Sequence, residues 1–366
     1  MPESTVAASR VGRGILVVAV AVAAISAVLV AGMISGANPH CCDGQHPYVR
    51  LYDKERTQLE AFLVTGDAQA FAALAQDPTL AHPEHVDPPA EYAYRAQRPV
   101  WGYLAWITSL GQPDLAGWAL VVLSVLGAAA LAAVTAALAQ RRGCSPWWGL
   151  LVVVAGLQTL SELTPELLAA ALFGGALLCR RDRRPFAIGL LCLAALTRES
   201  MLIGVAAWAL FELVHTGGRA PQRLRAVLPF AIPFVTYLAW TAILHARLGM
   251  WPWDRTGDRL VAPLSGIAGA WSSGSTQPIS GFVLGVGLCA AAWVLARRDV
   301  LTWVATGYLA FAVTFSADVW ERGGYLRTLV PLFVFGTVAV AGGWRARARA
   351  TRPSPQRVRV EDARVA

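Results

Sequence analysis

The segment GILVVAVAVAAISAVLVAGMI, from Gly14 to Ile34, is an uninterrupted apolar run near the start of the chain. About 20 apolar residues are enough for a helix to cross a bilayer. A cleaved signal peptide is the alternative, but its apolar core is normally about 7–15 residues long. We therefore expect a retained membrane span, followed at once by the polar stretch HCCDGQH, His40 to His46.

The composition extends this interpretation to the whole chain. Of 366 residues, 56% are hydrophobic and 15% are charged, whereas soluble domains carry roughly 25% charge. The net charge of +8 comes from short arginine clusters between apolar runs, a pattern typical of membrane topology and not of nucleic-acid binding. We expect an all-α polytopic protein in contact with membrane lipid. Arginine and alanine dominate and Lys54 is the single lysine, which is typical of a high-GC bacterial genome and favours a bacterial plasma membrane.

Nine further apolar segments predict about ten transmembrane helices in total. The segment 185–215 is ambiguous, because it is either one long helix or two short spans that turn at Arg198-Glu199. Two spans place the arginine clusters on the same side as the N-terminus, as the positive-inside rule requires, and we therefore favour them. The nine segments are 115–139, 145–161, 164–179, 185–197, 200–215, 227–246, 279–296, 299–316 and 327–343.

The predicted domain organisation is simple. Residues 1–343 form one transmembrane domain, within which 37–113 is a long extracytoplasmic loop. The basic tail 344–366 is expected to be cytoplasmic and disordered, and both termini are expected on the cytoplasmic side.

Short helices are expected within the long loop. Pro47 to Val64 has helical spacing of apolar residues, and Asp67 is placed to cap a second helix that runs through Leu74. Both are interpreted as helices that lie on the membrane surface. Tyr92 to Leu110 mixes aromatic residues with arginines and is expected to form a re-entrant or interfacial helix.

This topology places many ionisable residues on the extracytoplasmic face, at or near the ends of spans. An ionisable group at membrane depth costs about 2.5–3.5 kcal/mol, and such a group is a functional-site hypothesis by default. The residues are His40, Asp43, His46, Arg95, Arg98, Glu162, Glu166, Arg198, Glu199, Asp254, Asp318, Glu321, Arg322 and Arg327.

Asp43 is the candidate general base. Its neighbour Gly44 allows a ligand to approach closely, although a loop or capping carboxylate is the alternative. The nearby cysteines and histidines suggest zinc, but Cys41 and Cys42 are adjacent, which is poor spacing for two ligands of one ion. No cofactor is predicted, and the sequence does not decide whether a divalent metal is bound. The other histidines of this loop are His82 and His85.

Arginines supply the candidate phosphate ligands, because their planar fork of donors suits phosphate. At Arg198 and Glu199 there are two alternatives: the arginine binds a phosphate, or the two residues form an ion pair with each other at a turn. Arg95 and Arg98 lie among aromatic residues, which suits a phosphate or sugar contact but also an ordinary interfacial belt. For Arg322 and Arg327, the alternative to phosphate binding is a position in a solvated loop. The sequence contains no Walker A motif, dinucleotide-binding turn or Gly-x-Ser-x-Gly elbow.

Three short stretches resemble the GT-C superfamily of membrane glycosyltransferases, in particular bacterial mannosyltransferase-like members that build cell-surface glycopolymers. They are Asp43-Gly44-Gln45 after the first span, Tyr94-Arg95-Ala96-Gln97-Arg98 before an aromatic helix, and Thr197-Arg198-Glu199 between two spans. The long first loop and about ten spans add to the likeness. The chain departs from the pattern at Cys41-Cys42, where an aromatic residue is commoner, and it is short for the superfamily.

The resemblance implies a transferase that moves a hexosyl or pentosyl group from a polyprenyl-phosphate donor to a glycan or lipid-linked acceptor of the cell envelope, with inversion. In that mechanism Asp43 acts as the base, and Arg98, Arg198 and Arg322 stabilise the phosphate. The other residues expected to bind substrate are Gln45, Arg95, Glu199 and Arg327.

Two other classes of function remain open. Intramembrane charges also suit a transporter or flippase of a lipid-linked sugar or a small solute, but carriers usually have internal repeats and short loops. A non-catalytic envelope-assembly protein is the third possibility. Chemical turnover of a polyprenyl-phosphate sugar separates the enzyme from both.

Overall fold

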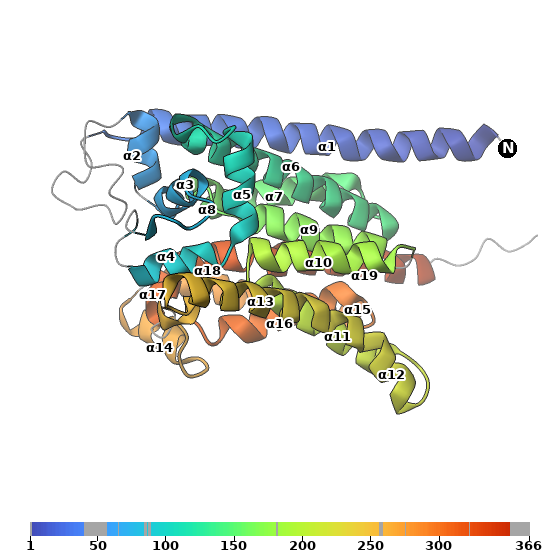
Figure 1. Cartoon of the computed structure of the whole chain (residues 1–366). Helices are drawn as coiled ribbons and strands as arrows, with labels where there is room; N and C mark the ends of the chain where they lie inside the picture. Colours follow the sequence, from blue (N-terminus) through green and yellow to red (C-terminus); the bar gives the residue numbers. More distant parts are fainter. Residues whose placement is uncertain are drawn as a thin grey trace, which may run out of the picture.

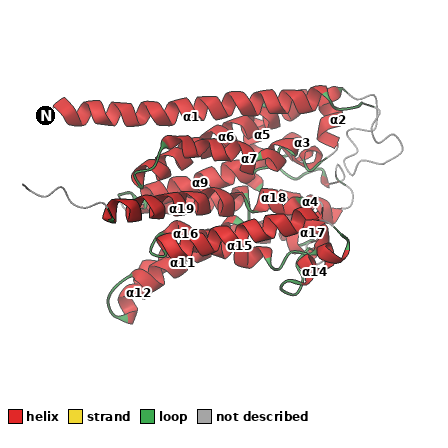
Figure 2. Cartoon of the chain, turned by 180° about the vertical axis from the view of Figure 1, so that it is seen from behind, coloured by secondary structure: helices red, strands yellow, loops and turns green. Residues whose placement is uncertain are grey.

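In the computed structural model the long helices run side by side in roughly one direction, and short helices such as α5 (Pro99–Thr108) run across them (Figures 1 and 2). In the part of the chain that it describes, every regular element is a helix, and one isolated antiparallel bridge joins Leu260 to Phe315. The described residues are 2–39, 57–64, 66–83, 86, 89–180, 182–255, 259–274, 276–321 and 323–351.

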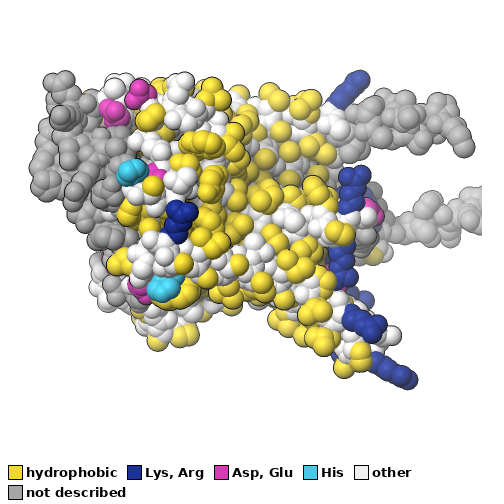
Figure 3. Space-filling view, in the orientation of Figure 1, with side chains coloured by type: hydrophobic (Ala, Val, Ile, Leu, Met, Phe, Trp, Pro, Cys, Tyr) yellow, Lys and Arg dark blue, Asp and Glu magenta, His cyan; other side chains and the backbone are white. Residues whose placement is uncertain are grey.

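Four helical segments among the described residues are long and apolar enough to cross a membrane. Apolar side chains also form a broad band across the middle of the face shown in Figure 3. Together these features identify a membrane-embedded helical protein. The four segments lie within α1 (Pro2–Ser35), α6 (Ala116–Arg141) with the turn before it, α12 and α13 (Ala220–Val227 and Ala231–Leu248), and α15 (Thr276–Ala296).

The predicted count of about ten spans is not confirmed. Five further apolar helical segments have only 10–17 residues. At 1.5 Å per residue, a helix of 14 residues is about 21 Å long, which is shorter than the roughly 30 Å hydrocarbon core. The five are Pro146–Ala155, Glu166–Cys179 (α9), Arg184–Thr197 (α10), Met201–His215 (α11) and Val300–Ala312 (α16).

The chain breaks between α10 and α11, at the position where a turn was predicted. Arg198 is extended, with φ −154° and ψ 117°, and its amide closes α10 by donating to the Ala194 carbonyl. From this break α11 returns towards the end of the molecule where α12 lies (Figure 1). The two-helix alternative therefore describes this segment, although both helices are short.

The first loop differs from its prediction in two ways. Residues 68–75 of α3 (Ala68–Gln76) are all buried, against α5 and α6, because an alanine-rich helix is apolar on every side. The expected surface-lying helix is therefore an internal one. The single helix expected over Tyr92–Leu110 is two, because Pro99 starts a new helix. The loop helices are α2 (Gln58–Val64), α3, α4 (Pro89–Ala96) and α5 (Pro99–Thr108).

The two ends of the molecule differ in charge. Arginines gather at the end that carries α12 and the last turns of α19, here called the arginine-rich end (Figure 3). The opposite end, the short-helix end, carries the loop helices and acidic residues. Helix α19 (Val330–Ala350) continues past the predicted domain boundary at residue 343. The other short-helix-end elements are η6 (Pro252–Arg255), α8 (Leu157–Ser161), α14 (Ser265–Ser272), α17 (Ala317–Glu321) and α18 (Gly324–Thr328).

Candidate functional site

A large cavity of about 1250 Å³ opens at the short-helix end. Typical sites for small molecules measure roughly 300–1,000 Å³, so this cavity has room for more than one small group. One part of its wall is polar, with Asp67, Tyr94, Glu162, Arg198, Arg259 and Arg327. Another part is apolar, with Met33, Phe62, Ile203, Trp253, Phe311 and Phe315.

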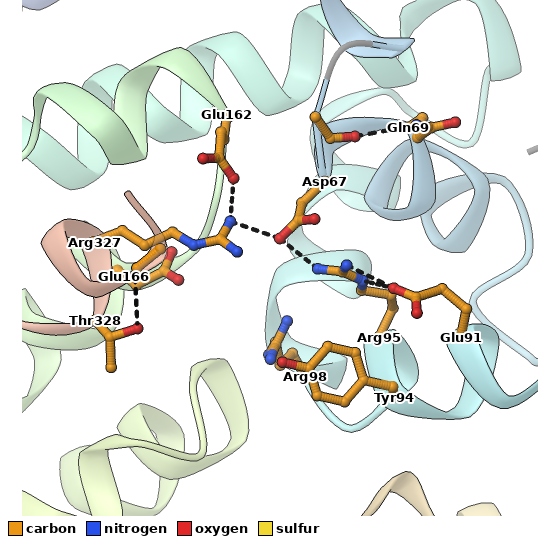
Figure 4. A network of polar contacts seen from close by, with 12 residues as sticks. Asp67, Gln69, Glu91, Tyr94, Arg95, Arg98, Glu162, Glu166, Arg327 and Thr328 are labelled. Atoms are coloured by element: carbon orange, nitrogen blue, oxygen red, sulfur yellow. Dashed lines mark hydrogen bonds and ion pairs between the residues drawn. The ribbon is translucent and has the colours of Figure 1, made fainter. Parts of the chain in front are cut away.

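Asp67 lies between two arginines, Arg327, which lines the cavity, and Arg95, which does not (Figure 4). Its Oδ2 lies 2.5 Å from Arg95 Nη1 and 2.6 Å from Arg327 Nη1. Burial raises the pKa of this carboxyl, but the two guanidinium groups outweigh burial and hold the pKa well below its usual range. Asp67 holds the N-cap position of α3, as the sequence predicted, but its side chain makes no capping hydrogen bond, because the arginines bind its carboxylate.

Glu162 lies on the other side of Arg327 and is ion-paired with the same Nη1 (Figure 4). Burial raises the pKa of Glu162, and the opposing effect of Arg327 does not restore its usual value. Glu162 therefore takes up a proton at higher pH than an exposed glutamate does. The cavity wall thus holds one carboxyl that stays ionised and another that can be protonated more easily.

Arg98 and Glu199 form a two-point ion pair behind the cavity wall. Arg98 Nε donates to Glu199 Oε2 at 2.8 Å, and Nη2 donates to Oε1 at 2.7 Å. The Arg98 side chain is 0% exposed. Burial raises the pKa of Glu199, but Arg198 and Arg98 outweigh it and hold the pKa well below its usual range. Arg98 therefore holds Glu199 in place and does not itself face the cavity.

Arg198 lines the cavity and is held more loosely. Its Nη2 lies 3.3 Å from Glu166 Oε1, and its Nη1 lies 3.7 Å from Glu199 Oε1. Its Nε is buried and has no hydrogen-bond partner in the described residues. Because both Nη contacts are long and Arg198 lines the cavity, its terminal nitrogens are placed to donate to a ligand there.

Arg259 and Tyr94 complete the polar wall. Arg259 Nη1 donates to Tyr94 Oη at 3.3 Å, and the guanidinium carbon lies 4.9 Å from the ring centroid. Within the described ranges no carboxylate lies within 4.0 Å of Arg259. Burial raises the pKa of Tyr94, but Arg98 and Arg198 outweigh it, and the net effect lowers the pKa to about 8. The sequence did not identify Arg259 as a site residue, because it lies in a connecting segment outside the predicted spans and outside the three motifs.

Five of the predicted substrate-binding residues belong to one network. Arg198, Glu199 and Arg327 line the cavity, whereas Arg95 and Arg98 lie behind its wall and hold Asp67 and Glu199. Residues of four separate chain segments therefore meet at this site.

Three predicted residues, Asp43, Gln45 and Arg322, lie outside the described residues. The cysteine and histidine cluster that suggested zinc, from His40 to His46, lies outside them as well. Over the part of the chain that is described, no three His, Cys, Asp or Glu side chains gather as metal ligands.

No known protein family, curated protein or solved structure matches this chain significantly. The evidence for a function is therefore the polar and apolar lining of the cavity.

Proposed function

We propose that this protein is a membrane glycosyltransferase. It takes a sugar from a polyprenyl-phosphate donor and transfers it to a glycan or lipid-linked acceptor on the outer side of a bacterial plasma membrane. The short-helix end faces outwards in this proposal, and the arginine-rich end faces the cytoplasm, as the positive-inside rule favours.

The observation that carries the proposal is the position of Arg198 and Arg259 beside an apolar wall in one cavity. A polyprenyl-phosphate sugar has an apolar chain, an anionic phosphate and a polar ring. The apolar wall suits the chain, the two guanidinium groups suit the phosphate, and polar groups nearby suit the sugar hydroxyls. Among these polar groups is Gln97, which is fixed by the hydroxyl of Tyr237 at 2.6 Å.

The reaction needs little acid catalysis, because a lipid phosphate is already a good leaving group. A base accepts the proton of the acceptor hydroxyl, and the acceptor oxygen forms a bond to the anomeric carbon. The bond from that carbon to the phosphate oxygen breaks, and its electron pair stays on the phosphate. Arg198 and Arg259 stabilise this charge. Asp43 is the proposed base, and a single displacement inverts the anomeric centre.

The experiment supplies the purified protein, in liposomes, with polyprenyl phosphates that carry labelled hexoses or pentoses, together with envelope lipid and glycan acceptors. Released polyprenyl phosphate and glycosylated acceptor are measured. The matched variants are Arg198→Gln and Arg259→Gln, with Arg247→Gln as control. Arg247 is exposed, contacts the Thr79 carbonyl and does not line the cavity.

The other functions predict different results in the same assay. A flippase or transporter moves the labelled lipid across the bilayer unchanged, and an assembly protein does neither. Either result would replace the transferase proposal.

A further inference from the structure

A second cavity, of about 630 Å³, lies at the arginine-rich end, far from the site described above. It runs between the turn that follows α6 and the last turns of α19. Arg345 and Arg349 line it together with Trp148 and Trp344. Neither the transferase mechanism nor the sequence motifs use these residues.

Within the described residues, Arg345 and Arg349 have no carboxylate partner, unlike Arg142. Arg142 is neutralised by Asp299, with Nη2 at 2.7 Å from Oδ1. Arg347 points elsewhere and donates to the Val294 carbonyl. Among the described carboxylates, none lies within 4.0 Å of Arg345 or Arg349. These two positive charges therefore remain to be balanced by something outside the described chain.

The turn after α6 is shaped to receive Arg349. Gly143 has φ +71°, and a Cβ atom at this position would lie 2.6 Å from Arg349 Nη2. Glycine therefore serves both the left-handed backbone and the close approach of the guanidinium group. Cys144 lines the same cavity as the two arginines. Burial raises the pKa of this thiol, and Arg345 and Arg349 are among the cations that oppose the rise.

An apolar stripe leads from these arginines towards the middle of the molecule. Thr337, Ala341, Trp344 and Ala348 line the cavity and recur at three- or four-residue spacing, so they share one face of α19. From Thr337 to Trp344, on the inner side of the two arginines, the stripe is about 10 Å long at 1.5 Å per residue. It therefore covers the first part of an acyl chain in a leaflet whose hydrocarbon is about 15 Å deep.

The aromatic residues lie where such a leaflet would meet its head groups. Trp344 is 69% exposed and Trp148 is 39% exposed. Tryptophan is enriched at membrane–water interfaces, because its ring is apolar and its N–H is polar.

We propose that this cavity binds an anionic glycerophospholipid of the surrounding leaflet. The lipid phosphate lies between Arg345 and Arg349, and an acyl chain follows the stripe on α19. Basic pockets at the end of transmembrane helices bind such head groups through charge and hydrogen bonds. This proposal is independent of the transferase function.

The test compares retention of phosphatidylglycerol and of phosphatidylcholine with identical acyl chains, by native mass spectrometry of the purified full-length protein. We expect phosphatidylglycerol to be retained at about tenfold lower concentration. Both lipids carry the same phosphate, but only phosphatidylcholine carries a quaternary ammonium group, which cancels the net charge that attracts the two arginines. The double variant Arg345→Gln/Arg349→Gln should lose this preference. The double variant Arg223→Gln/Arg225→Gln, which removes the same charge from α12 at the same end, should keep it.

Three results would overturn the proposal. The wild-type protein could retain both lipids equally, a measurement that needs no variant. The α12 variant could lose as much binding as the cavity variant, which would indicate attraction by net charge alone. Glycerol phosphate could displace the lipid at equal concentration, which would make the acyl stripe irrelevant.

Discussion

Arg98 and Glu199 are 101 positions apart in the chain and form a two-point ion pair. The pair links the break between α4 and α5 to the break between α10 and α11. Arg98 lies at the first break and Glu199 at the second, and their opposite charges are paired with each other. Glu199 lines the cavity and Arg98 does not. Arg98 therefore contributes to the polar wall by holding the Glu199 carboxylate in position.

Glu199→Gln should lower the free energy of unfolding by about 3–5 kcal/mol, because it leaves Arg98 buried without a charged partner. Thermal or denaturant unfolding in detergent measures the change. The double variant Arg98→Met/Glu199→Leu should lose clearly less than the sum of the single variants. Asp182→Asn, which changes an exposed carboxylate at the arginine-rich end, serves as the control. Additive losses in the double variant would contradict the buried-pair interpretation.

Asp67→Asn separates the observed role of Asp67 from a capping role. Asparagine caps helices as well as aspartate does, so a cap would survive the change. We expect instead a marked loss of stability, because Arg95 and Arg327 both lose their shared carboxylate. Asp77→Asn is the comparison, since the Asp77 carboxylate accepts hydrogen bonds from local backbone amides and Tyr92 and forms no ion pair in the described residues. Wild-type stability in Asp67→Asn would show that the two ion pairs matter little.

Tyr94 should ionise with a midpoint near pH 8. The phenolate is the charged form, and the nearby guanidinium groups favour it, so the proton leaves at lower pH than from an ordinary tyrosine. Because the folded-state pKa is depressed, the resulting stabilisation is present above the unfolded pKa of about 10 and is lost as the pH falls through about 8. Titration of ring-carbon NMR signals in protein labelled at tyrosine measures the midpoint.

Tyr94→Phe assigns the NMR signal of Tyr94, and Arg259→Gln should shift its midpoint upwards. Tyr103→Phe is the control, because Tyr103 is 40% exposed on α5. A Tyr94 signal that does not titrate below pH 10 would show that the arginines do not act on this phenol.

Arg198→Gln and Arg259→Gln should each reduce the rate of sugar transfer about 10²–10³-fold, the usual effect of removing a group that stabilises developing charge. The loss should lie in kcat, because the charge on the phosphate grows in the transition state. Initial rates over a range of donor concentrations separate kcat from KM. Arg247→Gln should transfer at the wild-type rate, and an equal loss in that variant would point to a general charge effect.

Part of this architecture could be predicted from the sequence. The break at Arg198-Glu199 follows from two charged residues inside an apolar segment, since each is expensive to bury in lipid. The presence of short helices in the first loop follows from apolar spacing, but the division at Pro99 and the burial of α3 were not predicted. The number of membrane spans could not be derived, because helices such as α9 and α10 are apolar but shorter than a bilayer.

The ion-pair network was harder to predict. Arg98 and Arg198 were identified as candidates, yet Arg98 turned out to hold Glu199 behind the wall. Which carboxylate an arginine contacts depends on packing between distant segments, and a single sequence does not specify that. Asp67 and Arg259 were missed as members of the site for the same reason.

The most direct test of the central claim is the transfer assay with purified protein and labelled polyprenyl-phosphate sugars. We predict release of polyprenyl phosphate together with a glycosylated acceptor of inverted anomeric configuration, and loss of both in Arg198→Gln but not in Arg247→Gln. Donor that crosses the bilayer with its sugar still attached, or that stays intact with every acceptor, would contradict the claim.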